Sequence, residues 1–447
     1  EILNFNKKFD IVICVGVFEY SSAFIGGEDP HDAALAYFSS LLKPNGSLLI
    51  AIENQFGLKY FSSGKEDHTN VMFDGIEGYS RFPGKARTFG KTEITNRIKK
   101  YFANAEFYYP YPDYKIPSCI ISEDAFSKIG VGELISNFHS PRMNEYFSKP
   151  LFDETLALME LEKNDSLEFF ANSFLIIANK GDSSSIDFPQ LGIFHSIDRK
   201  PRYQTKSIVK LVDQDVVVEK IILNEGSKTS LPSDMLSLSS TTTKWIDGAS
   251  LEFLLYKQSK TYNLSLSELF KPCMLWLKSL DEMSREIGHP GFVDGKYVDY
   301  IWRNTIIGDG QSHFIDNEWR FHSNISINAL TIRSIFHFLI KTKNSKDLAS
   351  CLKSWSLYNQ IIDIAKVIGV RLSNDDFNEF YNLELNMGKA SNRKQSDMPE
   401  AALKFYLKFT RVHEFLIALK ANTISTLRSF NLTLARINSL LKRVFFR

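Results

Sequence analysis

The chain has 447 residues, of which 44% are hydrophobic and 23% are charged, and its formal net charge is +1. This length predicts two or three domains with sizeable cores, and the balanced charge argues against a protein that binds nucleic acid over its whole surface. The four cysteines lie far apart without a CxxC pair, which indicates a reducing compartment and argues against a zinc site. The sequence contains no run of 18 apolar residues and therefore predicts no membrane-spanning helix. We expect a cytoplasmic protein.

Residues 1–180 alternate between strand and helix patterns. The runs "FDIVICVG" and "SLLIAIEN" have the length of buried strands, and "DPHDAALAYFSSLLKPNG" between them predicts a helix that Asp29 or His31 opens. The helix pattern "KTEITNRIKKYFANA" and the strand patterns "EFYYPYPD" and "FFANSFLIIANK" follow. Strands that are apolar on both faces and alternate with helices predict an α/β fold with a largely parallel sheet, covered on both sides.

Ligands of open parallel sheets bind at the carboxyl ends of the strands. The first strand here ends in "CVGVFEY", where Gly16 allows a ligand to approach the backbone closely. The combination "FDIVICVGVFEY…YFSSLLKPNGSLLIAIEN" resembles the fourth strand, the next helix and the fifth strand of a class I S-adenosylmethionine-dependent methyltransferase. The strands "EFYYPYPD" and "SFLIIANK" resemble the antiparallel hairpin that ends this fold.

The resemblance implies that residues 1–180 are the C-terminal part of a Rossmann-like methyltransferase domain, with strands four to seven of its sheet. The cofactor, S-adenosyl-L-methionine, or the transferred methyl group would contact four residues: Val15, Gly16, Val17 and Phe18. Acceptor binding or proton removal has three weaker candidates: Glu53, Asp67 and His68. The alternative for "EDHT" is a capped, solvated loop.

The family's Gly-rich loop and its ribose-binding acid, which belong to the first two strands of the fold, have no counterpart in these residues. We therefore expect that the N-terminus of the protein is missing from this sequence and that this chain binds the cofactor weakly. We also expect the strand at 9–15 to be an exposed sheet edge, which is a hazard for aggregation. The stretch "AIENQFGLKYFSSGKEDHTNVMFDGIEGY" resembles methyltransferase domains encoded with bacterial surface-polysaccharide genes.

Residues 181–200 contain the polar stretch "GDSSSIDFPQ" and are predicted to be a linker. Residues 201–345 then begin with the strand patterns "KSIVKLVD" and "DVVVEKIIL" and continue with helices. Near their end, "YVDYIWRNTIIGDGQSHFIDNEW" predicts a hairpin around a Gly-Asp-Gly turn, flanked by carboxylates. Carboxylate and amide oxygens are ligands of Mg²⁺, and phosphoryl transfer needs Mg²⁺, a cation on the phosphates and a base.

The spacing D-x-x-x-x-N, followed by a hairpin and "ID", resembles protein-kinase-like and aminoglycoside-phosphotransferase-like folds of the α+β class. The resemblance implies Asp299 as the base and Asn304 and Asp316 as Mg²⁺ ligands. It also implies an ATP site, in which the phosphates would contact Lys220 and the adenine would meet backbone groups of the hinge, formed by Trp245, Ile246 and Asp247.

Three features depart from an active kinase. No Gly-rich loop covers the phosphates, and Tyr297 and Val298 stand where a histidine is expected before the catalytic aspartate. The interval between Lys220 and the hinge is also short, and Glu225 is the only acid close behind the lysine. Two alternatives therefore stay open: a structural hairpin whose aspartates cap turns, and a non-catalytic module that binds a glycan or a partner protein.

Residues 346–447 have helical patterns, and the last 47 carry nine basic residues and one acid, Glu414. Apolar residues in this tail recur at the spacing of a coiled coil or an amphipathic helix: Leu427, Phe430, Leu434, Ile437, Leu441 and Val444. Such a helix can pack on its own domain, mediate self-association into a homo-oligomer, or contact the anionic inner face of a membrane as a peripheral protein.

Together these patterns resemble the bifunctional kinase–methyltransferases that terminate bacterial O-polysaccharide chains. The resemblance implies a methyltransferase that acts on a surface glycan or a lipid-linked saccharide, and a kinase-like domain that phosphorylates the same acceptor. A glycosyltransferase is an expected partner. The alternatives are a kinase-like domain that only binds, and a structural scaffold that depends on the tail.

Overall fold

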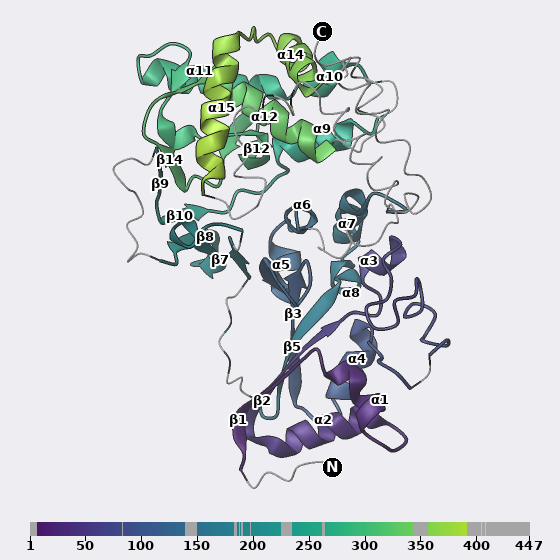
Figure 1. Cartoon of the computed structure of the whole chain (residues 1–447). Helices are drawn as coiled ribbons and strands as arrows, with labels where there is room; N and C mark the ends of the chain where they lie inside the picture. The colour runs from purple at the N-terminus through teal and green to yellow at the C-terminus, as the bar shows by residue number, and fades with distance from the viewer. Residues whose placement is uncertain are drawn as a thin grey trace, which may run out of the picture. The chain divides into compact units, whose positions relative to one another are not determined.

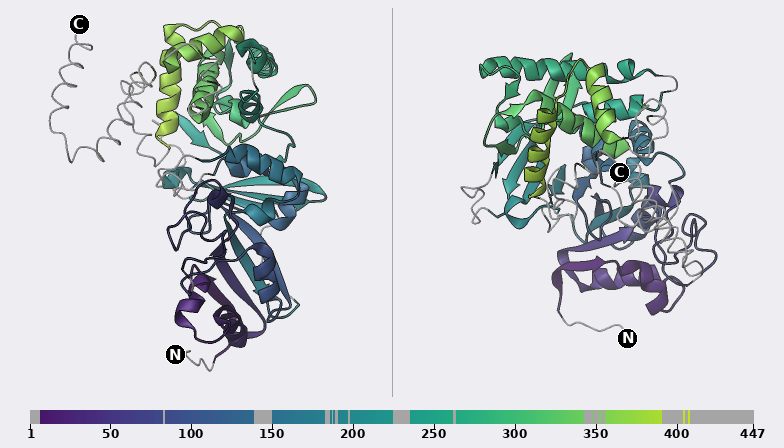
Figure 2. Two further views of the ribbon diagram at one scale, coloured as in Figure 1. Left: turned by 90° about the vertical axis from the view of Figure 1, so that its right-hand side faces the viewer. Right: turned by 45° about the horizontal axis from the view of Figure 1, so that its top comes forward.

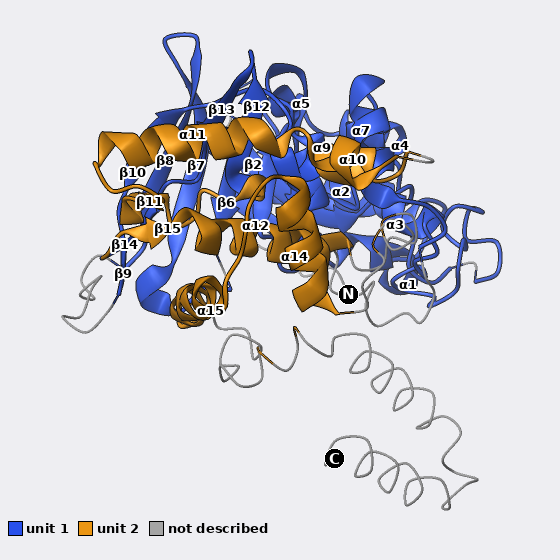
Figure 3. Ribbon diagram, turned by 90° about the horizontal axis from the view of Figure 1, so that it is seen from above, with its two compact units in different colours: residues 1–253, 304–322 blue, residues 254–303, 323–447 orange. Residues whose placement is uncertain are grey.

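The structure of the chain is a computed structural model. It describes residues 7–82, 84–138, 150–182, 186, 188, 191–196, 198–224, 235–261, 264–342, 348, 352, 356–390, 404 and 407. The chain forms two compact units, of which unit 1 holds Glu1–Phe253 and Asn304–His322 (Figure 3). Unit 2 holds Leu254–Arg303 and Ser323–Arg447. The four-part division predicted from the sequence stays a prediction.

A nine-stranded mixed sheet is the framework of unit 1 (Figures 1 and 2). Its strands, in spatial order, are β1 Phe9–Val15, β2 Leu42–Glu53, β5 Ser173–Asn179, β3 Asn104–Tyr111, β4 Cys119–Ser122, β6 Gly192–His195, β7 Thr205–Val212, β8 Asp215–Ile222 and β10 Thr241–Lys244. Strand β6 lies within residues 181–200, which were predicted to be a linker, and it pairs with both β4 and β7.

The sheet is mixed and not largely parallel as the sequence predicted. Of the strand pairs in the described part of this sheet, only β1–β2 is parallel. Strand β5 lies between β2 and β3 and runs against both, so β1, β2 and β3 share one direction. The prediction failed because an apolar run indicates only that both faces of a strand are buried. A central antiparallel strand such as β5 is buried on both faces as well.

The prediction of an exposed edge strand at 9–15 is confirmed. In the described residues β1 pairs with β2 alone and ends the sheet. Alternate side chains of β1 are exposed, with Ile13 at 67%. The row of backbone groups on its outer side therefore faces solvent in the described structure.

Helices pack on the sheet of unit 1 and build its core. They are α1 Ser21–Phe24, α2 Pro30–Leu41, α3 Leu58–Phe61, α4 Lys91–Ile98, α5 Glu123–Lys128, α6 Gly132–Ser136, α7 Glu154–Lys163 and α8 Leu167–Phe170. Asp29 begins α2 as predicted, because its carboxylate accepts a hydrogen bond from the backbone N–H of Asp32 at 3.1 Å. Helix α2 contacts both β1 and β2, whereas α4 and α5 contact β3.

Two small ladders complete unit 1. The predicted hairpin is present as β12 Thr305–Gly308 and β13 Gln311–Phe314, and the other ladder pairs β9 Leu236–Leu238 with β14 Trp319–Phe321. Short 3₁₀ turns are η1 Phe18–Tyr20 and η3 Pro201–Tyr203. Helix α9, Leu251–Gln258, crosses the boundary between the units.

Unit 2 is mainly helical in its described residues. Its elements are α10 Leu266–Phe270, α11 Cys273–Glu286, β11 Phe292–Val293, η4 Gly295–Tyr297, η5 Trp302–Asn304, β15 Ile325–Ser326, α12 Ile327–Thr342, α14 Leu357–Val367 and α15 Asn374–Gly388. Helix α12 is buried along most of its length and contacts α14 and α15. Among the described residues, none of the helices combines the length and the hydrophobicity of a membrane span. The predicted coiled-coil tail, including the repeat at 427–444, and Glu225 lie outside the described residues.

Candidate active site

The carboxyl end of β1 has the close backbone geometry that its glycine predicts. Gly16 adopts a φ of +62°, and its N–H donates to the carbonyl of Ala51 in β2 at 3.0 Å. A Cβ added to Gly16 would lie 2.8 Å from the hydroxyl of Tyr114, so both the conformation and the space require glycine.

The other three residues predicted to touch the cofactor differ in exposure. Val15 is exposed, and Val17 is exposed to 57%. Phe18 is fully buried, and its ring packs against His31 and Phe89 in the core of unit 1. The side chains of the two valines are therefore accessible to solvent, whereas Gly16 is partly buried and the Phe18 side chain packs into the core.

Three ionisable side chains from separate segments meet at the carboxyl ends of β1 and β2. We call Glu19, Glu53 and His68 the acid–histidine cluster. Glu19 follows β1 in η1, Glu53 is the last residue of β2, and His68 lies in the loop after α3. One nitrogen or oxygen from each residue lies within 4.8 Å of the others, and His68 Nε2 is 3.5 Å from Glu53 Oε2.

Polar neighbours hold the cluster in place. The Tyr20 hydroxyl is 2.9 Å from Nδ1 of His68, and the Lys115 ammonium forms an ion pair with Oε1 of Glu53. The Glu66 carboxylate accepts the backbone N–H groups of His68 and Thr69 at 2.7 and 2.6 Å. The loop "EDHT" is therefore capped by Glu66, as the alternative interpretation expected, yet its histidine points to the cluster and not to solvent.

Asp67 lies beside the cluster in a network of its own. Its carboxylate accepts from the Lys59 ammonium and the Tyr60 hydroxyl, each at 2.6 Å, and Lys115 lies 3.8 Å away. Asp67 is thus held by cations, which leaves Glu53 and His68 as the better placed of the three residues predicted for acceptor chemistry. The sequence interpretation missed Glu19 and Lys115, because nothing in the local pattern ties them to Glu53.

Burial and charge act in opposite directions within the cluster. Burial raises the pKa of Glu19 above its usual value, and the nearby Glu53 carboxylate adds to this effect. Burial alone would raise the pKa of Glu53, but the His68 imidazole and the Lys115 ammonium outweigh it and lower that pKa. Burial alone would lower the pKa of His68, but the Glu53 carboxylate raises it above the usual histidine value. The cluster therefore favours a charged Glu53–His68 pair beside a carboxyl group that retains its proton more readily.

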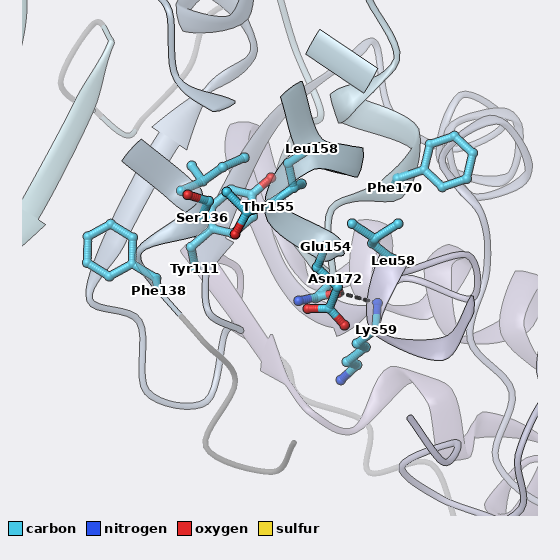
Figure 4. A pocket seen from close by; sticks show the side chains of 11 residues that line it. Leu58, Lys59, Tyr111, Ser136, Phe138, Glu154, Thr155, Leu158, Phe170 and Asn172 are labelled. Carbon is cyan, nitrogen blue, oxygen red and sulfur yellow. Dashed lines mark hydrogen bonds between the residues drawn. The ribbon is translucent and has the colours of Figure 1, made fainter. Parts of the chain in front are cut away.

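A pocket lies near this end of the sheet, between α3, the end of β3 and helices α6 to α8 (Figure 4). Its enclosed space is small, about 30 Å³, and the rest of the hollow is open to solvent. Its lining residues are Leu58, Lys59, Tyr111, Ile135, Ser136, Phe138, Glu154, Thr155, Leu158, Phe170 and Asn172. The backbone N–H of Lys59 donates to Asn172 Oδ1 at 3.2 Å, and the buried Tyr111 hydroxyl has no hydrogen-bond partner in the described residues. The lining combines aromatic rings with polar groups from several elements.

The predicted phosphate-site lysine and metal-site aspartate come together in unit 1. Lys220 on β8 forms an ion pair with Asp316, which follows β13 and has a φ of +61°. Glu318, whose side chain is 1% exposed, lies 3.5 Å from Lys220 and 2.5 Å from Arg199. The sequence interpretation did not assign Glu318 or Arg199, although the acid stands two positions after Asp316.

The remaining kinase-like residues occupy varied environments. Asn304 is buried at the start of the hairpin, where its carbonyl accepts the N–H of Ile315 at 2.9 Å. In the predicted hinge, Trp245 donates its indole N–H to Asp247 at 2.9 Å and its backbone N–H to Val216 at 2.8 Å. Ile246, between them, is half-buried. The adenine-binding role of this segment stays a prediction.

Asp299 belongs to unit 2, where it accepts a 2.7 Å hydrogen bond from Arg333 on α12. Burial alone would raise the pKa of Asp299, but the Arg333 charge outweighs it and lowers that pKa. Glu384 on α15 pairs with the same arginine at 2.6 Å. Asp299 therefore has a structural partner, and its predicted role as a base stays a prediction.

Comparison with known proteins gives solved structures but no family. No family model matches the chain, and no curated protein does. One similar structure is a SAM-dependent methyltransferase from Thermotoga maritima, described as a possible histamine N-methyltransferase, with 16% identity over 40% of this chain and a TM-score of 0.21. This chain spans 60% of that protein's length.

The other two structures are of PKMT2 from Rickettsia typhi, one of them in complex with AdoHcy. Both are 11% identical to this chain. The matches cover 83% and 88% of this chain and 80% and 82% of the Rickettsia chains, with TM-scores of 0.19 and 0.20. Likenesses with TM-scores this low do not establish the function of this chain.

Proposed function

We propose that the part of unit 1 around β1, β2, β5 and β3 belongs to a methyltransferase that uses S-adenosyl-L-methionine. The observation that carries this proposal is the strand arrangement: β1 and β2 are parallel, and the reversed β5 lies between β2 and β3. This is the order in which strands four, five, seven and six lie in the fold that the sequence resembles. Gly16 and the acid–histidine cluster lie at the carboxyl ends of the first two strands, where such sheets bind ligands.

Methyl transfer from a sulfonium needs a positioned nucleophile more than it needs covalent help from the protein. The exposed residues Val15 and Val17 offer contacts to the cofactor on either side of Gly16, where the absence of a Cβ allows close approach. The adjacent Glu19, Glu53 and His68 offer groups that hold the acceptor or take up its proton. The two functions therefore lie side by side on β1 and β2.

For the acceptor we propose a saccharide hydroxyl of a bacterial surface glycan or a lipid-linked saccharide. The pocket of Figure 4 supports this proposal, because Phe138 and Phe170 offer apolar faces and Ser136, Glu154 and Asn172 offer hydrogen-bonding groups. Pockets with apolar walls and a few polar groups suit ligands that need both contact area and orientation.

Saturation-transfer NMR with S-adenosylhomocysteine tests the cofactor proposal, because this method detects weak binding. We expect transfer to the adenine and ribose protons in the native chain and its loss in Gly16→Val, where the added side chain meets Tyr114. Gly26→Ala is the matched control, since no atom lies within 4 Å of its added Cβ. Equal transfer in the Gly16→Val variant, or none in the native chain, would overturn the proposal. The same experiment with short oligosaccharides tests the acceptor class.

A second proposed function, nucleotide binding by the kinase-like residues, is favoured by one observation. Lys220 and Asp316 are far apart in sequence yet form an ion pair. This pairing brings a phosphate-binding cation next to a carboxylate that can ligate Mg²⁺, as phosphoryl transfer requires. A module that binds a glycan or a partner protein without catalysis is the alternative.

Calorimetric titration with Mg-ATP separates these two functions. We expect binding by the native chain, and a loss of at least about tenfold in affinity for Asp316→Asn, because a neutral amide is a poor Mg²⁺ ligand. Asp309→Asn in the exposed hairpin turn removes the same charge and should leave the affinity unchanged. Absence of Mg-dependent ATP binding by the native chain would leave only the binding-module alternative.

A further inference from the structure

The acid–histidine cluster has an unusual set of unsatisfied atoms. Oε2 of Glu19, Oε2 of Glu53 and Nε2 of His68 are all buried, and none has a hydrogen-bond partner within the described residues. Glu19 and Glu53 are each only 1% exposed. Buried polar atoms are nearly always paired, and a buried carboxylate oxygen without a donor is costly. Oε2 of Glu53 and Nε2 of His68 lie 3.5 Å apart as an ion pair, so Oε2 of Glu19 is the one of the three atoms that no group of the described residues satisfies, and its side chain meets that pair.

The spacing of these groups suits a single bound cation. One potential ligand atom from each residue lies within 4.8 Å of the others. Zinc-like ions hold nitrogen and oxygen ligands at about 2.0–2.2 Å, so two ligands of one ion lie at most about 4.4 Å apart. Side-chain shifts of about half an ångström would therefore bring the three ligand atoms to metal-binding distances from one ion.

Contacts outside the cluster orient its members toward one another. Tyr20 occupies the other ring nitrogen of His68, at 2.9 Å from Nδ1, which leaves Nε2 directed at Glu53. Lys115 occupies the other carboxylate oxygen of Glu53. Ligating histidines are usually fixed in this way through the nitrogen that does not bind the metal. The two outer contacts thus select the atoms that face the centre.

The charges around the cluster also match a divalent ion. Lys59 is paired with Asp67, and Lys115 is paired with Glu53. Glu19 has no ion-pair partner among the described residues, although it is buried. A divalent cation would supply the partner that this buried carboxyl group lacks.

We propose that Glu19, Glu53 and His68 form a binding site for a divalent transition-metal cation, such as Mn²⁺ or Zn²⁺. One imidazole and two carboxylates suit ions that accept both nitrogen and oxygen, whereas Mg²⁺ and Ca²⁺ prefer oxygen alone. The remaining coordination positions are available to water or to a hydroxyl of an acceptor. The proposal does not depend on methyl transfer, because binding of the ion is measured directly.

The first test is titration of the whole chain, freed of metal with a chelator, with Mn²⁺ alone. Loss of the free-ion EPR signal should show one tight site per chain, and the bound ion should raise the melting temperature. Pulsed EPR of the bound Mn²⁺ should show coupling to one imidazole nitrogen. Absence of saturable binding, or bound Mn²⁺ without nitrogen coupling, would overturn the proposal without any variant.

Variants then locate the ion. Glu19→Gln and His68→Gln should each weaken Mn²⁺ binding by at least about tenfold, and Tyr20→Phe should weaken it by about tenfold through the outer contact. Glu28→Gln removes an exposed charge from the same region and should change the affinity by less than about twofold. If Glu19→Gln and His68→Gln fold normally and keep the native affinity, the ion binds elsewhere and the assignment is wrong.

Discussion

At the scale of single residues, Arg333 shows how a buried charge is held. Its side chain is 5% exposed on α12, and its guanidinium donates to Glu384, to Asp299 and to the carbonyl of Val298 at 2.6, 2.7 and 2.8 Å. His337, one turn further along α12, contacts Glu384 at 3.0 Å. Arg333 and His337 interrupt the apolar run "ISINALTIRSIFHFLI", and both are paired within unit 2.

Replacing this arginine should destabilise unit 2 strongly. Arg333→Met retains much of the apolar volume but leaves two buried carboxylates without their cation. We expect a loss of about 3–5 kcal/mol in the free energy of unfolding at neutral pH, which chemical denaturation measures. Lys278→Met, which removes one partner of an exposed pair on α11, is the control and should leave the stability unchanged. Equal midpoints for the two variants would contradict a stabilising role of the Arg333 network.

The same network should make stability depend on pH. Burial alone would raise the pKa values of both acids, but Arg333 lowers the pKa of Asp299, and His337 together with Arg333 lowers the pKa of Glu384. Burial lowers the pKa of His337. The unfolded chain therefore binds more protons than the folded chain at acid pH, so the free energy of unfolding falls as pH falls. The carboxylates contribute fully above their unfolded pKa values of about 4 and lose this contribution below them. The stability gap between native chain and Arg333→Met should accordingly narrow below about pH 4.

At the scale of elements, the β12–β13 hairpin places Asp316 next to Lys220. Gly308 pairs with Gln311, so Asp309 and Gly310 form a two-residue turn, and both have positive φ angles of 50° and 71°. Aspartate followed by glycine is a preferred pair for such turns, because its twist matches that of the strands. The hairpin could therefore be predicted from sequence together with its register.

Substituting the turn glycine tests this account. Gly310→Val forces a branched side chain into the left-handed region and should cost about 1–2 kcal/mol of stability, measured by urea denaturation. Gly308→Val, two residues earlier in β12, is the matched control, because its φ is not in that region and no atom lies within 4 Å of an added Cβ. A larger loss for Gly308→Val than for Gly310→Val would contradict the turn assignment.

At the scale of the whole molecule, the sequence predicted the positions of helices and strands that depend on local patterns of residues. Asp29 begins α2, Gly16 follows β1, and the strands β1, β2, β3 and β5 were predicted, because apolar runs and breakers are local signals. Strand β4 was missed. Composition alone does not show the direction of β5, because a buried strand has the same composition in either direction. The resemblance to the methyltransferase fold implied that β3 and β5 pair antiparallel, and this pair is present. The acid–histidine cluster was found only in part, because Glu19 joins Glu53 and His68 through the pairing of β1 with β2 and through a loop conformation.

The pairing of β6 with β4 and β7 has a consequence for experiments that separate the proposed methyltransferase part of the chain from the kinase-like residues. Because the sheet of unit 1 runs without interruption from β1 to β10, a chain divided within residues 181–200 would lose the backbone hydrogen bonds that join its two halves. A division before β6 would leave a row of unpaired N–H and C=O groups on β4 in one piece and on β6 in the other, and a division after β6 would leave them on β6 and β7. A protease cut at the same place should leave fragments that co-purify, since the ladder, and not the peptide bond, holds them together.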